Sequence, residues 1–118
     1  MSNLNQFRSG LLKFNTGQLL DVSNASSTQS AAFQSDTVAI AIGSVGTQSP
    51  TAGVHFTIGS NPTATTGNVL MPHVTDLSFS DKSGGSGYLI IGVNAGDKIA
   101  VIKTEGYGVK ASVIELKY

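Results

Sequence analysis

The stretch Val38-Ala39-Ile40-Ala41-Ile42 decides the fold of this chain. Its bulky β-branched residues alternate with alanine, and an apolar pattern of period two predicts a β-strand. Alanine, instead of lysine or glutamate, on the second face indicates that this face is covered as well. Gly43 and Gly46 follow and end the strand. We therefore expect a strand that is buried on both faces.

Similar short apolar segments follow this stretch as far as the C-terminus. Residues 54–58 alternate in the same way and stop before Pro62, because proline restricts the residue that precedes it. Residues 88–91 are apolar at every position, which is typical of a strand covered on both faces. Further strands are predicted at 69–71, where Pro72 confines the strand to a sheet edge, and at 77–79, 98–103 and 109–116, with 19–22 as an optional eighth.

The turns and the spacing of these segments indicate the fold class. Asn94-Ala95-Gly96-Asp97 predicts a tight hairpin turn that pairs residues 98–103 back onto 88–91, with Gly96 in the left-handed conformation. A spacing of about 8–12 residues without any helical segment predicts an all-β fold, an antiparallel two-sheet sandwich of jelly-roll-like or related topology. The expected core consists of Val38, Ile40, Ile42, Val54, Phe56, Ile58, Leu77, Phe79, Leu89, Ile91, Ile99 and Val101.

The first 35 residues differ from the rest. Their apolar residues follow neither a helical period nor a clean alternation, and residues 23–35 are too polar and too small to build a core alone. A partly disordered terminus is one interpretation. The other, which we adopt, is an extended N-terminal arm over residues 1–35 that orders against a neighbouring subunit, with the β-sandwich domain over 36–118. The residues expected to make the contact are Leu11, Leu12, Phe14, Leu19, Leu20 and Phe33.

The composition argues against several classes of partner. Charged residues make up 12% of the sequence, seven Lys+Arg balance seven Asp+Glu, and Ser and Thr supply 26 of 118 positions. An ordinary soluble domain carries about 25% charged residues, so we expect much of this surface to face other protein. No basic stripe is present that would neutralise nucleic-acid phosphates. The longest apolar stretches fall far short of the ~20 residues that span a bilayer.

The first residues and the cysteine content suggest where the chain is made. The chain has no cysteine, so neither disulfides nor thiolate metal sites contribute. Residues 1–8 do not resemble a secretory signal, and we expect the chain to be made in a cytosol.

The sequence contains no recognisable catalytic motif. His55 and His73 are the only imidazoles, and Asp76 and Asp81 follow His73. A metal site or a Ser-His-Asp relay can be drawn from these residues, but such a relay is defined by geometry and not by sequence position. No GxSxG, HExxH or acidic calcium loop occurs. We expect structural histidines, no catalytic residue, no metal, no cofactor and no enzymatic activity.

Four segments suggest a family. They are Ile58-Gly59-Ser60-Asn61-Pro62-Thr63-Ala64-Thr65, then Leu70-Met71-Pro72 leading to Phe79, then Val93-Asn94-Ala95-Gly96-Asp97-Lys98-Ile99-Ala100-Val101-Ile102, and the closing strand Ala111-Ser112-Val113-Ile114-Glu115-Leu116. In this order they resemble a group of small proteins from tailed bacteriophages, often encoded among the virion structural genes. The similarity covers roughly residues 30–118. It implies a small β-sandwich that coats or braces a phage particle.

The resemblance and the composition lead to the same expectation. We expect a capsid decoration, or cement, protein that binds the major capsid protein on the shell surface, forms a homotrimer, and contacts neither nucleic acid nor membrane. Such a protein depends on buried area and shape matching, and interface cores are depleted in charge. The alternative is a tail-associated or host-recognition module that binds surface carbohydrate. Tyr88, Tyr107 and Tyr118 would favour it if they shared one face, and otherwise they are packing residues.

Overall fold

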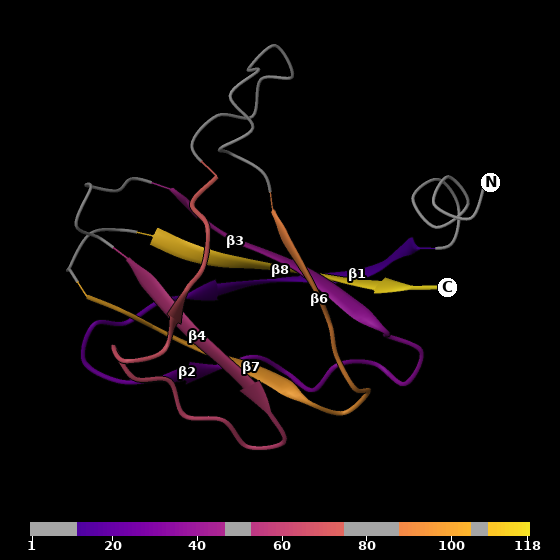
Figure 1. Cartoon of the computed structure of the whole chain (residues 1–118), viewed down its shortest axis with the longest axis horizontal. Helices are drawn as coiled ribbons and strands as arrows, with labels where there is room; N and C mark the ends of the chain where they lie inside the picture. The colour runs from indigo at the N-terminus through magenta and orange to yellow at the C-terminus, as the bar shows by residue number, and fades with distance from the viewer. Residues whose placement is uncertain (1–11, 47–52, 75–87, 105–108) are drawn as a thin grey trace, which may run out of the picture.

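The structure is a computed structural model that describes residues 12–46, 53–74, 88–104 and 109–118. These residues form eight strands and no helix. Figure 1 shows how the strands are arranged. The strands are β1 (Lys13–Asp21), β2 (Thr28–Gln29), β3 (Ala39–Gly46), β4 (Val54–Gly59), β5 (Val69–Leu70), β6 (Leu89–Gly92), β7 (Lys98–Lys103) and β8 (Val109–Lys117). The described part of the chain has no helix that could cross a membrane.

The strands form two antiparallel sheets of four strands each. Sheet A has the order β1-β8-β3-β6, and sheet B has the order β2-β7-β4-β5. The first strand pairs with the last, the second with the seventh, the third with the sixth and the fourth with the fifth. Two further pairings, β3 with β8 and β4 with β7, complete the sheets. The predicted all-β fold with two antiparallel sheets is confirmed.

One hydrophobic core draws its side chains from both sheets. Ile40 and Ile42 of β3, and Ile99 and Val101 of β7, are completely buried. Fully burying one such side chain contributes about 1.5–3 kcal/mol to folding. The core cluster consists of Val22, Phe33, Ile40, Ile42, Val54, Phe56, Met71, Ile99, Val101, Val109, Ala111 and Val113.

Half of the expected core lies in this cluster. The six confirmed residues are Ile40, Ile42, Val54, Phe56, Ile99 and Val101. Ile58 and Ile91 are partly buried against it. Leu89 is 40% exposed, and Val38 is half-buried beside a surface groove. Leu77 and Phe79 lie outside the described residues.

The structure corrects the division of the chain into an arm and a domain. β1 pairs with β8 over its whole length, and β2 pairs with β7. Val22 and Phe33 are core residues with 5% and 3% of their surface exposed. Residues 12–35 therefore supply one strand to each sheet and two side chains to the core, and residue 36 is not a domain boundary.

A β-bulge helps to explain why only residues 19–22 of this region were predicted as a strand, and only as an optional one, although β1 begins at Lys13. The register of β1 against β8 shifts between Phe14 and Thr16. A bulge inserts one extra residue and so moves every following side chain to the opposite face. The apolar residues of β1 consequently lose the alternation that would have revealed the strand.

Two predictions about residues 88–103 were wrong. β6 pairs with β3 and β7 pairs with β4, so the two strands belong to different sheets and form no hairpin. β6 is also an edge strand, and Ile90 lies on the face of its sheet that points away from the core, so it is 58% exposed instead of covered. The turn itself is confirmed, with Gly96 at φ 86° and a hydrogen bond from the Asp97 N–H to the Asn94 carbonyl oxygen. The edge position predicted for residues 69–71 is confirmed by β5.

Candidate interaction surface on the outer face of sheet A

The outer face of sheet A, opposite the core, is apolar. Because Ile40 and Ile42 point into the core, Ala39 and Ala41 lie on the outer face. In the register, Ala41 lies between Ile90 of β6 and Ile114 of β8. Ala39 and Ala41 are only 6% and 8% exposed, whereas Ile90 is 58% exposed. The small residues of β3 thus form the floor of a trough with larger side chains beside it.

The edge strand β1 adds two of the most exposed apolar side chains in the described chain. Phe14 is 67% exposed and lies opposite Leu116, and Leu19 is 59% exposed and lies opposite Ser112. Gly17 lies between them opposite Ile114. Leaving two large apolar side chains in water is unfavourable, so this arrangement marks a surface that a partner can cover.

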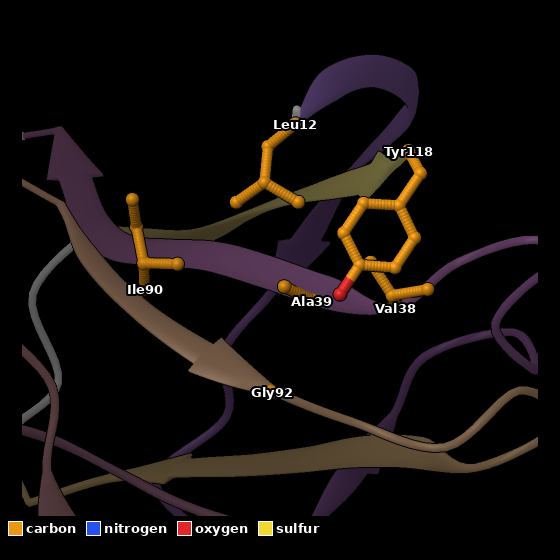
Figure 2. A pocket seen from close by; sticks show the side chains of 6 residues that line it. All are labelled: Leu12, Val38, Ala39, Ile90, Gly92 and Tyr118. Carbon is orange, nitrogen blue, oxygen red and sulfur yellow. The ribbon is translucent and has the colours of Figure 1, made fainter. Parts of the chain in front are cut away.

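A groove opens at one end of this face. It has a volume of about 400 Å³ and is lined by Leu12, Val38, Ala39, Ile90, Gly92 and Tyr118. These residues come from, or directly flank, all four strands of sheet A. Figure 2 shows the side chains of Leu12, Ile90 and Tyr118 around β3 at Ala39. The phenolic hydroxyl is the one polar side-chain group among the lining residues.

Charged residues lie at the ends of the sheet. Lys110 pairs with Asp21 at one end, and the hydrogen bond from Lys110 lowers the pKa of the Asp21 carboxyl. At the opposite end of β8, Lys117 lies 3.7 Å from Asp36. A hydrogen bond from the Asn15 side chain is the main cause that lowers the pKa of Asp36. Between these ends, the described residues place no charged side chain on the outer face.

The predicted contact residues separate into two groups. Leu12, Phe14 and Leu19 come together on the outer face or in its groove. Phe33 points the other way and is buried in the core, and Leu20 is partly buried against the core on the same side. Leu11 lies outside the described residues.

The histidines have structural partners. His55 is 8% exposed, and its Nδ1 lies 2.8 Å from the Asn68 carbonyl oxygen. The Nδ1 of His73 lies 2.8 Å from the Oγ of Ser44, and burial lowers the pKa of His73. Ser44 is only 2% exposed, so its hydroxyl is not accessible to a substrate.

The described residues also offer no metal site. They contain no group of three His, Cys, Asp or Glu side chains that could hold an ion. Asp76 and Asp81, the other residues weighed for a relay, lie outside the described ranges.

A buried carboxylate is the polar feature that the sequence interpretation missed. Glu115 is 1% exposed, and its Oε1 accepts hydrogen bonds from the Gln34 N–H at 2.9 Å and the Thr37 hydroxyl at 2.7 Å. Its Oε2 accepts a third from the Gln18 side-chain amide at 3.1 Å. The sequence could have revealed this buried carboxylate, because the alternation of β8 places Glu115 on the same face as Val113. This cluster joins β8, β1 and the segment before β3, and its role is structural.

Comparisons of the chain with protein-family models, with curated proteins and with solved structures find no match.

Proposed function

We propose that this protein is a virion structural protein of a tailed bacteriophage, a non-enzymatic capsid decoration protein that stabilises the head shell. The observation that carries the proposal is the apolar outer face of sheet A. Its partner would be the major capsid protein, and its location the outer surface of the capsid. The resemblance of residues 30–118 to small phage virion proteins supports the same assignment.

The strand pairing supports a jelly-roll sandwich as the finer description of the fold. The strands pair first with last, second with seventh, third with sixth and fourth with fifth, as in one long antiparallel hairpin. The hairpin is rolled up, so that successive pairs alternate between sheet A and sheet B. Jelly rolls have eight strands in two sheets and recur in viral capsid and lectin domains. A fold alone does not assign a function, so this argument is secondary to the surface.

The chemistry of the outer face suits a protein partner. Each Å² of apolar surface removed from water contributes about 25 cal/mol, and the large exposed side chains here come from β1 and β6. The absence of charge from the middle of the described face matches the charge depletion of interface cores. Neutral overall charge also favours association of this chain with copies of itself.

The test is binding of the purified chain to expanded shells of the phage that encodes it, prepared without this protein. We expect the chain to co-sediment with the shells and to raise their resistance to heat. Ile90→Lys places a charge on the outer face and should abolish binding. Val69→Lys is the matched control on sheet B, because Val69 is 65% exposed against 58% for Ile90. Failure of the unmodified chain to bind, or equal binding by both variants, would contradict the proposal.

One observation favours the alternative, a tail-associated or host-recognition module that binds carbohydrate. Tyr88 and Tyr118 are 39% and 69% exposed. Tyr118 lines the groove. The ring of Tyr88 lies close to Gly43 on the same face, since a Cβ added at Gly43 would be 3.2 Å from it. Aromatic rings on one face provide stacking platforms for sugars. Tyr107, the third tyrosine of that prediction, lies outside the described residues.

The surroundings of the two rings favour a protein partner over a sugar. Sugar hydroxyls need polar side chains that fix their orientation, and the groove supplies only the tyrosine hydroxyl. A glycan array distinguishes the two functions. Specific glycan binding that is lost in Tyr118→Ala, without binding to shells, would support the alternative.

A further inference from the structure

β1 presents nine residues of unpaired strand edge. In the described part of the chain it is the terminal strand of sheet A, and its one partner strand there is β8. Among the described residues, no other backbone hydrogen bond reaches it. Backbone groups along such an edge form a template for another strand, and natural proteins usually shorten or cover it. β1 is among the longest strands of the fold and holds no proline.

The side chains of β1 are self-complementary about Gly17. On the outer face, Phe14 precedes Gly17 and Leu19 follows it. Because the bulge makes Asn15 and Thr16 occupy one pairing position, an antiparallel copy of β1 centred on Gly17 would place Leu19 opposite the partner's Phe14. Two such aromatic–aliphatic pairs would flank two glycines, and pairs of this kind stabilise adjacent strands.

The charges at the two ends of β1 are compatible with an antiparallel pair. The strand begins with Lys13 and ends with Asp21. An antiparallel pair keeps the two lysines apart and the two aspartates apart, whereas a parallel arrangement would bring like charges together. The two side chains point to opposite faces of the sheet, and Asp21 is already paired with Lys110, so the ends contribute no new ion pair.

We propose that β1 pairs antiparallel with β1 of a second copy of this chain, across a two-fold axis at Gly17. The two copies of sheet A then form one continuous eight-stranded sheet, and their outer faces become one surface. The contact uses the same surface on both subunits, as two-fold dimers do. This inference does not depend on the proposed function, because the edge would pair in the same way whatever the outer face binds.

A single introduced cysteine tests the pairing directly, because the chain has none of its own. Residues opposite each other in an antiparallel pair have Cα atoms about 4.5–5.5 Å apart, within the range of about 4.4–6.8 Å that a disulfide spans. Gly17→Cys places two thiols at the axis. The fold tolerates the change, since an added Cβ would meet only the Val113 carbonyl oxygen, at 3.8 Å.

Two control variants carry the cysteine elsewhere. In Leu19→Cys the two thiols are displaced by about four residues along the strand, roughly 13 Å, too far for a disulfide. Leu70→Cys is on sheet B and is 55% exposed, and it measures cross-linking by random collision. Circular dichroism of each variant checks that it is folded.

We expect Gly17→Cys to form a reducible dimer on mild oxidation, at least about tenfold faster than either control. Sedimentation of the unmodified chain should show a dimer in equilibrium with monomer. Leu19→Lys should raise the dissociation constant by about tenfold or more, and Leu70→Lys should leave it unchanged. Equal cross-linking of Gly17→Cys and Leu70→Cys would overturn the proposal. A chain that is monomeric at all concentrations would overturn it equally. So would a chain that forms the predicted trimer while its Gly17→Cys variant forms no disulfide.

Discussion

Replacement of Glu115 by glutamine tests how the buried cluster holds β8, β1 and the segment before β3 together. All three groups around the carboxylate donate hydrogen bonds, from Gln34 N–H, the Thr37 hydroxyl and the Gln18 amide. Glutamine has nearly the same shape but offers one acceptor oxygen and one NH₂ group. At least one partner must therefore lose its acceptor.

The magnitude follows from the least disruptive orientation. The new oxygen can keep the donors from Gln34 and Thr37, and its NH₂ group then faces the side-chain NH₂ of Gln18. Gln18 cannot rotate its amide without loss, because its Oε1 accepts a hydrogen bond from the Ala31 N–H at 2.9 Å. The Gln18 NH₂ group keeps a second acceptor, the Ala31 carbonyl oxygen at 3.4 Å, so the group left without an acceptor is the new NH₂ group at the buried position 115. A buried donor without an acceptor costs about 1–3 kcal/mol. We expect Glu115→Gln to lower the free energy of unfolding by this amount.

A second change at Gln18 should restore the stability. Gln18→Glu alone brings two carboxylates together and is destabilising. In the double variant, the amide at position 115 donates to the new carboxylate at position 18, which still accepts from Ala31. The double variant should therefore be more stable than either single variant, with a coupling energy of about 1–3 kcal/mol.

Urea unfolding followed by far-UV circular dichroism measures all four proteins of the cycle. The midpoints should move while the slope with urea stays constant, since the folded and unfolded surfaces do not change. Gln29→Glu combined with Glu115→Gln is the control, because Gln29 bonds to Asn61 and Pro62 and should show no coupling. Simple additivity in the Gln18 and Glu115 cycle would refute the assigned network.

Three further outcomes are expected. Removal of residues 1–35 takes a strand from each sheet and two core side chains, so the remainder should show no cooperative melting by circular dichroism; a folded remainder would restore the predicted arm. Gly96→Ala should cost about 1–2 kcal/mol because φ is 86° there, whereas Gly59→Ala, with open space and no positive φ, should change the urea midpoint by much less. Burial holds the pKa of His73 below its ordinary value of 6.5, so the unfolded chain takes up the proton first as the pH falls. Stability should thus be full above about pH 6.5 and decline below it, and urea midpoints of His73→Asn between pH 8 and 5 should decline less than those of the unmodified chain.

The sequence by itself determined the strands whose side chains alternate without interruption. Residues 38–42, 54–58 and 98–103 were identified because a buried strand face imposes a period of two on its own residues. The left-handed conformation of Gly96 was predictable for a similar reason, since the turn chemistry lies within four residues. These features need only local information, and they were sufficient to predict an all-β fold with two antiparallel sheets.

The tertiary structure alone decided which strands are neighbours, and with them the candidate site. Local patterns show which face of a strand is apolar but not which strand lies beside it. The pairing of β1 with β8 brings Gln18 to Glu115 across 97 positions of sequence, and the bulge at Asn15 hides β1 from any pattern of period two. Phe14 and Phe33 are therefore alike in sequence and opposite in the fold, one exposed on the outer face of sheet A and the other buried in the core. Burial depends on which strand lies beside each residue, and only long-range pairing fixes that.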